Sequence, residues 1–362
     1  MKARIVRLLG VAEGQTSETG SGGLESELTS RRDEQNEIQL LDLTTNNVGD
    51  QECAAIAEFI LGAGSSLAAV RLGGNKISSR GIERLVPSLR GASGLRELWL
   101  GNNSLGCSGV RALADGALRA LVALEELWLC GVSLSDDGAV ALGEALCDAP
   151  LPALRWLLLN NNHIGDDGAQ ALAAALPVLP RLAMLSLRCN AVGDRGAAAV
   201  ALALQVAPSL QQLFLETNAL SCVGIASVAA AAPHCATLTE LRLGGMGLRH
   251  EGAQAVARML PRVPRLECLG VAFGADEADL DGAAASIVRA IPSAPALRRV
   301  DGIDLCLHLH ELGLPSTLHQ TSSNHAIFQA LVARRSEEDQ EAGGAAAATA
   351  AGAPAAAATW EA

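Results

Sequence analysis

The sequence predicts an α/β solenoid built from repeated strand, turn and helix units, and three observations predict it. A pattern of the form L-x-x-L-x-L-x-x-N-x-L recurs nine times, and successive copies start 28 to 30 residues apart. Small and apolar residues at helical spacing follow each copy. Of the 362 residues, 49% are hydrophobic, so every unit can contribute to a continuous core.

The strand pattern is clearest in residues 95–105, which read LRELWLGNNSL. Pattern positions 1, 4, 6 and 11 are expected to face a shared interior, where each side chain contributes about 1.5 to 3 kcal/mol on burial. One unit cannot cover this apolar face alone, so the units are expected to stack. The copies start at Ile38, Leu67, Leu95, Leu124, Leu154, Leu182, Leu210, Leu238 and, in degraded form, Leu266, with a remnant from Leu297.

A column of asparagines at pattern position 9 is expected to hydrogen-bond the backbone where each strand turns away. It comprises Asn46, Asn75, Asn103, Asn162, Asn190 and Asn218. Val132, Met246 and Gly274 interrupt the column, and we expect looser turns at these three places.

Helices are expected after each turn, as in residues 165–176, GDDGAQALAAAL. Several begin with acidic pairs, among them Asp136 with Asp137 and Asp166 with Asp167. Carboxylates at a helix start accept hydrogen bonds from free N–H groups and complement the helix dipole. We therefore interpret these pairs as helix caps rather than as catalytic acids or cation ligands.

The two faces of the predicted stack differ in width. Parallel strands lie about 4.8 Å apart, whereas packed helices need about 8 to 10 Å. The stack must therefore bend into a horseshoe, with parallel strands on the concave face and helices on the convex face.

Composition divides the chain into four parts. Residues 1–37 are interpreted as an N-terminal lead and cap, and residues 38–296 as the nine repeats. Residues 297–335 depart from the pattern and are interpreted as a degenerate repeat with a C-terminal cap. Residues 336–362 are acidic and then rich in alanine with Gly, Thr and Pro, which predicts a disordered tail.

The strand sequence L-x-E-L-W-L…N-x-L and the helix sequence G-D-x-G-A-x-x-L resemble the ribonuclease-inhibitor-like subfamily of leucine-rich repeats. The resemblance covers about residues 38–300. It implies a leucine-rich-repeat horseshoe that acts as a partner-binding scaffold, without fixing the partner. The chain contains no GxxxxGK[ST] nucleotide-binding motif, so no NACHT-type ATPase module is expected with the repeats.

Charge and cysteine usage exclude several classes of partner. The formal net charge is −12, which repels phosphate backbones and argues against nucleic acid. No apolar run approaches the length of a membrane span, so no membrane partner is expected. Nine cysteines are scattered without a CxxC pair, which favours reduced thiols and a cytoplasmic location.

Pattern positions 3, 5 and 7 share the solvent-facing concave side, because side chains alternate along a strand. Three of the four tryptophans and one of the four phenylalanines fall at these positions. In a chain with 2% aromatic residues, this apolar stripe with a charged rim predicts a protein-binding surface. The candidate partner-binding residues are Glu97, Trp99, Glu126, Trp128, Trp156, Leu158, Met184, Arg188, Phe214, Glu216 and Arg242.

Two other interpretations of the stripe stay open at this point. A helix, the C-terminal tail or a second copy of the chain could cover it. The tryptophans could also serve only to stiffen the sheet through cross-strand pairing.

Signals for catalysis and for cofactors are weak. Cys306, His308 and His310 alternate with leucines, but a transition-metal site needs further ligands that the sequence does not supply. The remaining histidines are isolated and form no nucleophile–base pair. We therefore expect no enzyme activity, no cofactor and no metal.

The leading hypothesis is a scaffold that binds a protein partner of unknown identity through the concave face. The alternative is a GTPase-activating regulator of a small GTPase, because the Ran GTPase-activating protein has the same repeat type. A third possibility, sensing of a microbial ligand, would need a signalling module on another chain.

Overall fold

The computed structural model describes residues 29–32, 38–273 and 280–301. The strands in this part of the chain form one eleven-stranded sheet, in which they follow one another in chain order. The first strand pairs antiparallel with the second, and all later neighbours are parallel. The strands are β1 (Thr29–Arg32), β2 (Ile38–Asp42), β3 (Ala69–Arg71), β4 (Glu97–Trp99), β5 (Glu126–Trp128), β6 (Trp156–Leu158), β7 (Met184–Ser186), β8 (Gln212–Phe214), β9 (Glu240–Leu248), β10 (Cys268–Phe273) and β11 (Arg299–Asp301).

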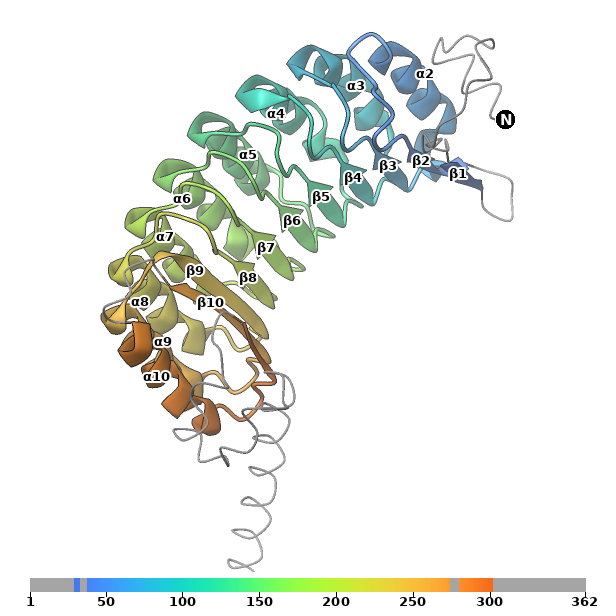
Figure 1. The fold of residues 1–362 in the computed structure, drawn as a ribbon. Helices are drawn as coiled ribbons and strands as arrows, with labels where there is room; N and C mark the ends of the chain where they lie inside the picture. Colours follow the sequence, from blue (N-terminus) through green and yellow to red (C-terminus); the bar gives the residue numbers. More distant parts are fainter. Residues whose placement is uncertain (1–28, 33–37, 274–279, 302–362) are drawn as a thin grey trace, which may run out of the picture.

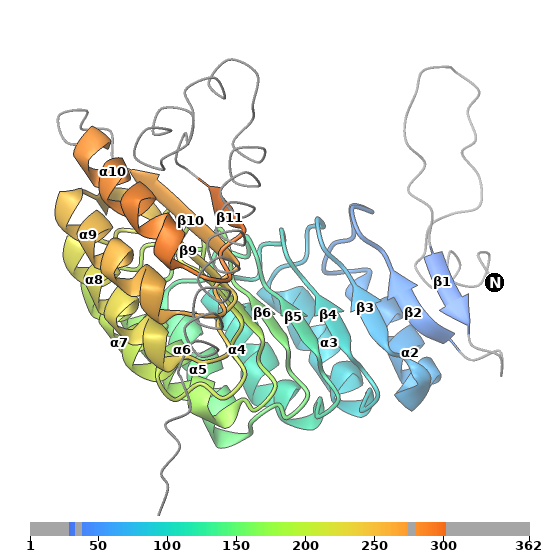
Figure 2. The ribbon, with the colours of Figure 1, turned by 90° about the horizontal axis from the view of Figure 1, so that it is seen from below.

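One helix follows each strand from β2 to β10 in the described part of the chain, and short 3-10 turns extend six of these helices. The helices lie along the outer, convex side and the strands along the inner, concave side, as the two views show (Figures 1 and 2). The predicted horseshoe solenoid is confirmed. The helices are α2 (Cys53–Ala63), α3 (Ser79–Gly91), α4 (Gly106–Gly116), α5 (Asp136–Asp148), α6 (Asp166–Ala175), α7 (Asp194–Leu204), α8 (Cys222–Ala231), α9 (His250–Met259) and α10 (Leu280–Ala290).

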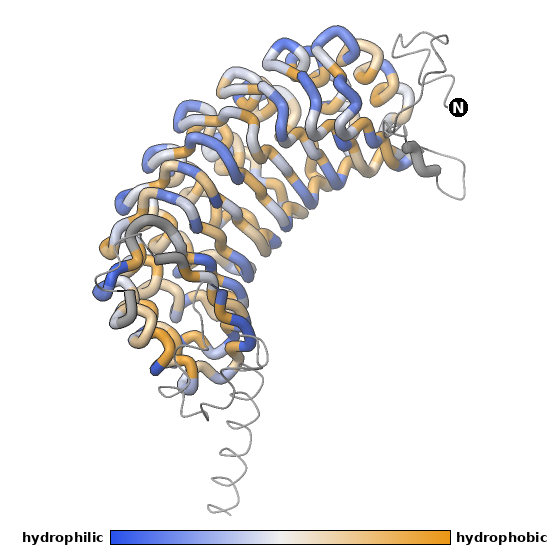
Figure 3. The backbone as a smooth tube through the Cα atoms, in the orientation of Figure 1, coloured by the Kyte–Doolittle hydropathy of each residue, from blue (hydrophilic) through white to orange (hydrophobic). Residues whose placement is uncertain are grey.

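The core lies between the sheet and the helices, where the leucine pattern places it. In the repeat that contains β4, Leu95, Leu98, Leu100 and Leu105 are each at most 1% exposed. Hydrophobic segments continue along the inside of the stack from repeat to repeat (Figure 3). A single cluster of buried residues extends from Leu41 to Val300, so the repeats share one core.

The predicted asparagine column is confirmed, and it joins adjacent repeats. Asn162 Oδ1 accepts hydrogen bonds from the backbone N–H groups of Val132 and Leu134, at 3.0 Å each. Its Nδ2 donates to the carbonyl of Leu129 at 2.8 Å and to that of Leu159 at 2.9 Å. Similar bonds to the preceding repeat are made by Asn75, Asn103, Asn190 and Asn218.

The expectation of a looser turn at Val132 is wrong. Val132 is fully buried, and its N–H is bound by Asn162 of the following repeat, so the turn does not need an asparagine of its own. Around position 246 the chain stays extended, because β9 runs for nine residues, whereas β3 to β8 have three each. Gly274 lies outside the described residues.

The first acid of each pair, Asp136 or Asp166, does cap a helix, but the helix belongs to the next repeat; the second acid of the later pair, Asp167, forms an ion pair with Arg195 instead. Asp136 Oδ1 accepts from the N–H groups of Gly165 and Gly168, at 2.7 and 2.9 Å, and makes no cap within α5. Asp166 accepts in the same way from Gly193 and Gly196 at 2.8 Å. This second column of polar bonds also joins neighbouring repeats.

The two ends of the chain are described only in part. β1 lies within the predicted N-terminal lead and adds an antiparallel strand to the edge formed by β2. β11 starts the predicted C-terminal cap and pairs with β10. The rest of the N-terminal lead, the remainder of the C-terminal cap and the alanine-rich tail lie outside the described residues.

The asparagine column generates a stability prediction. We expect Asn162→Ala to lower the free energy of unfolding by about 2 to 4 kcal/mol, because buried backbone groups in two repeats lose their partners. Urea denaturation followed by circular dichroism measures the loss. Asn160→Ala, which removes one side-chain bond to Ser186 in the same turn, is the control. An equal loss in both variants would contradict a special role for the column.

Candidate protein-binding face

The inner side of the sheet brings all eleven predicted binding residues together. They lie on the six consecutive strands β4 to β9 or, for Arg188 and Glu216, two residues beyond β7 and β8. Parallel pairing aligns Glu97 with Glu126 and Trp99 with Trp128. Ten of the eleven side chains are half-buried and Arg188 is exposed, so they line the surface rather than the core.

A stack of flat side chains crosses β3, β4 and β5. The guanidinium of Arg71 lies 3.9 Å from the centre of the Trp99 ring. The Trp99 and Trp128 rings are stacked, with 4.0 Å between ring centres and 11° between their planes. Such contacts fix the orientation of aromatic groups on a surface. The sequence interpretation did not include Arg71, although its strand position matches that of Trp99 one repeat later.

Arg71 also forms ion pairs with carboxylates on both neighbouring strands. Its guanidinium lies 2.7 Å from Glu97 Oε2 and 3.7 Å from Asp42 Oδ2. The guanidinium is therefore held by β2 and β4 together while it covers the outer ring of the stack.

Glu126 is held differently from its neighbour Glu97. Trp99 Nε1 donates to Glu126 Oε2 at 3.2 Å, and no Lys or Arg of the described residues lies within 4.0 Å of the carboxylate. Burial raises the pKa of Glu126 and the charge of Glu97 adds to the rise, whereas the bond from Trp99 and the charge of Arg71 oppose it. The N–H of Trp128 is buried without a hydrogen bond, although it is close enough to lower the pKa of Glu126 slightly.

Apolar side chains fill the middle of the face. Trp156 and Leu158 on β6 lie beside Met184 on β7, and Phe214 follows on β8. All four are half-buried, so each presents an apolar edge to solvent. Their positions agree with the apolar stripe predicted from the sequence.

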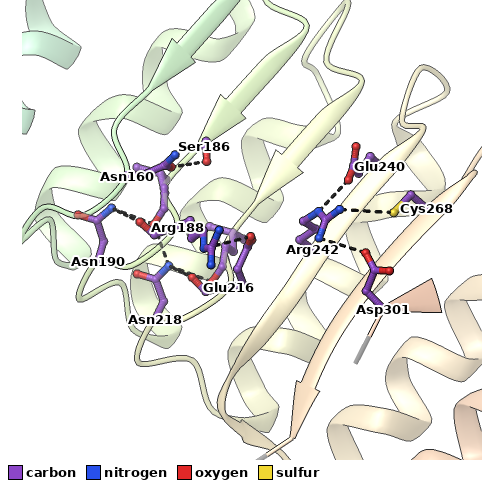
Figure 4. A network of polar contacts seen from close by, with 12 residues as sticks. Asn160, Ser186, Arg188, Asn190, Glu216, Asn218, Glu240, Arg242, Cys268 and Asp301 are labelled. Carbon is purple, nitrogen blue, oxygen red and sulfur yellow. Dashed lines mark hydrogen bonds and ion pairs between the residues drawn. The ribbon is translucent and has the colours of Figure 1, made fainter. Parts of the chain in front are cut away.

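A network of charges covers the far part of the face, from β8 to β11 (Figure 4). Glu240 accepts from Arg242 at 2.7 Å, from Gln212 at 3.0 Å and from Arg299 at 3.3 Å. Arg242 also lies 3.2 Å from Asp301. Because each carboxylate has a guanidinium beside it, this network is internally compensated.

Glu216 stands between the apolar stripe and this network. Its Oε1 lies 3.6 Å from Arg188, while its Oε2 is buried without a hydrogen-bond partner. Burial raises the pKa of Glu216, and the nearby Arg188 and Arg242 partly oppose the rise.

The described residues contain no group of three or more His, Cys, Asp or Glu side chains placed to hold a metal ion. The eight cysteines in this part of the chain are free thiols. Burial raises the pKa of Cys53 to about 12, and it also raises the pKa of Cys130, Cys147 and Cys268. None of these four thiols is therefore activated as a nucleophile.

None of the described helices is long and apolar enough to span a membrane.

The observed architecture is that of a repeat solenoid with an open concave sheet. Within it, the Leucine Rich repeat family model matches residues 154–173 and 184–201, which correspond to two successive strand and helix units. The family model thus matches two neighbouring units of the α/β repeat solenoid that the described residues form. No curated protein matches the sequence.

Several solved structures are similar to this chain. An internalin of Listeria monocytogenes is 15% identical, with 80% of this chain and 90% of that one covered and a TM-score of 0.39. The actin-binding site 2 of leiomodin-1 is 13% identical, with coverages of 59% and 96% and a TM-score of 0.34. A plant peptide hormone receptor, RGFR1 in complex with RGF2, is 15% identical, with coverages of 69% and 41% and a TM-score of 0.36.

The environment of Glu126 generates a pH prediction. Its folded-state pKa is raised above the ordinary 4.5, so the ionised carboxylate destabilises the fold, and the cost grows as the pH rises through the folded pKa. We expect Glu126→Gln to be more stable than the natural chain at about pH 7, with the difference vanishing below about pH 4.5.

Urea denaturation of both proteins across this pH range measures the effect. The control is Glu125→Gln, which removes a carboxylate that lies 3.9 Å from Arg155 and is expected to give no gain. A Glu126→Gln variant less stable than the natural chain at neutral pH would contradict the prediction.

Proposed function

We propose that this chain is a protein-interaction scaffold, not an enzyme, and that it binds a protein partner through the concave face. The observation that supports the proposal is the gathering of Trp99, Trp128, Trp156 and Phe214 on strands β4 to β8 in a chain with only 2% aromatic residues. Aromatic side chains dominate the binding energy of protein interfaces when they are present.

The charged border of the stripe supports the same proposal. An apolar centre with a polar rim is the usual anatomy of a protein interface. Glu97 and Arg71 border the stripe on one side, and Arg188, Glu216 and Arg242 border it on the other. A surface used only to stiffen the sheet would not need this rim.

The repeat subfamily and the cellular location are further parts of the proposal. We propose that the repeats are of the ribonuclease-inhibitor-like type, on the grounds of their 28- to 30-residue period and their strand–helix unit. We also propose a cytoplasmic location, which rests on the scattered and unpaired cysteines. The GTPase-activator hypothesis gains no support from the described residues.

Replacing Trp128 tests the proposed binding face. We expect Trp128→Ala to weaken partner binding by about 2 kcal/mol or more, because an aromatic anchor is removed from the centre of the face. Affinity capture on the immobilised full chain, compared by quantitative mass spectrometry, identifies proteins lost from the variant, and titration with each then gives the affinity.

Leu202→Ala is the matched control, since Leu202 is 69% exposed on the convex helix α7 and its loss removes apolar surface from the opposite face. Trp128 packs on Trp99, so the melting temperature of each variant is recorded and binding is measured well below it. Partners retained by Trp128→Ala and lost from Leu202→Ala would contradict concave-face binding.

A further inference from the structure

The concave surface of β2 to β5 carries more negative than positive charge. Three carboxylates project from these strands, on Asp42, Glu97 and Glu126, and Arg71 supplies the single guanidinium. The Arg71 guanidinium already forms ion pairs with Glu97 at 2.7 Å and with Asp42 at 3.7 Å, and it lies 3.9 Å from the Trp99 ring centre. Arg71 acts on the charge of Glu126 from farther away, and no Lys or Arg of the described residues lies within 4.0 Å of the Glu126 carboxylate.

The opposite part of the face shows that the imbalance is local. From the end of β7 to β11, three carboxylates lie beside three guanidiniums, and Figure 4 shows five of these six groups. These groups are Glu216, Glu240, Asp301, Arg188, Arg242 and Arg299. The excess negative charge therefore lies beside the tryptophans, where Arg71 is the one guanidinium on strands β2 to β5 that pairs with the carboxylates.

The surroundings of Glu126 favour a cationic ligand. The carboxylate accepts a hydrogen bond from the indole N–H of Trp99, and the N–H of Trp128 lies nearby without a bond of its own. Two oxygens that accept one such bond retain free acceptor capacity. In the parallel register, Glu126 lies between Glu97 on β4 and Trp156 on β6. Indole rings attract cations through their faces, and a half-buried carboxylate gains more from a cation than an exposed one does.

We propose that Glu126 binds a positively charged Lys or Arg side chain of the protein partner, whose neighbouring apolar residues pack on Trp128, Trp156 and Leu158. The inference rests on the proposed function, since it assigns a chemistry to one site within the proposed binding face. The net charge of −12 adds a long-range attraction for a basic partner.

Burial agrees with this assignment. The ionised form of Glu126 is destabilised in the free protein, as the raised pKa shows, and a partner's cation would remove that cost. Glu97 would contribute a second negative charge on the adjacent strand. The two carboxylates therefore give the site the charge to bind one cation, and aromatic side chains lie directly beside it.

The test uses a phage-displayed library of random twelve-residue peptides, selected on the immobilised full chain. Selected peptides are synthesised and titrated against the natural chain, Glu126→Gln and Trp128→Ala. Glu125→Gln is the charge-matched control, because Glu125 pairs with Arg96 and Arg155 at 3.8 and 3.9 Å and lies one residue before Glu126. Glu126→Gln preserves the shape of the side chain and an acceptor for the Trp99 N–H.

We expect the selected peptides to carry Lys or Arg next to apolar residues, and Glu126→Gln to weaken their binding at least about tenfold. Glu125→Gln should change the affinity less than about twofold. In a charge exchange, Glu126→Lys should bind the peptide in which the basic residue is replaced by glutamate more tightly than it binds the original peptide.

Two results would overturn the inference, and they differ in what they say about the proposed function. Peptides that need Trp128 but lack a basic residue, or bind Glu126→Gln as tightly as the natural chain, would exclude a cation at Glu126 and leave concave-face binding in place. Selected peptides that bind Trp128→Ala as tightly as the natural chain would overturn both.

Discussion

Lateral contact between neighbouring repeats is the constraint on which the rest of this structure depends. A unit with a three-residue strand and a helix of 10 to 13 residues has an apolar face that it cannot cover by itself. Leucines supply the apolar part of the contact, and two columns of polar bonds supply its register. Asn162 binds backbone groups of the preceding repeat, and Asp136 caps a helix of the following one. The open, concave inner wall is a result of this stacking.

The same stacking explains why the inner wall can carry unbalanced charge. Strand side chains that face the concave side contribute little to the buried core, so their identity is free to vary from repeat to repeat. Arg71, Trp99 and Trp128 form one continuous stack because the register sets them on adjacent strands. Glu126 lies at the edge of this stack with no Lys or Arg of the described residues within 4.0 Å, whereas Glu240 is paired with Arg242 and Arg299.

The leucine period predicted the strand order, the position of the helices and the face on which each candidate residue lies, because burial of the same positions recurs in every unit. Contacts between repeats were harder to predict. The sequence shows Asp136 at the start of α5, but only the spatial offset between units shows that its partners are Gly165 and Gly168. The turn at Val132 is regular because Asn162 binds it from the next repeat, which a search within one repeat cannot reveal. Side-chain conformation decides that Arg71 covers Trp99.

The strands are short, and this limits how the concave surface can change when repeat units are lost or gained. Strands β3 to β8 contribute three residues each, so the width of the inner wall along the strands is constant. Its length across the strands increases with the number of repeat units. Loss or duplication of a whole unit would rejoin equivalent surfaces and keep the asparagine and aspartate bonds. It would shift the distance between the indole stack and the Arg242 network by about 4.8 Å. The number of repeat units therefore sets the distance between the indole stack and the Arg242 network in steps of one strand spacing.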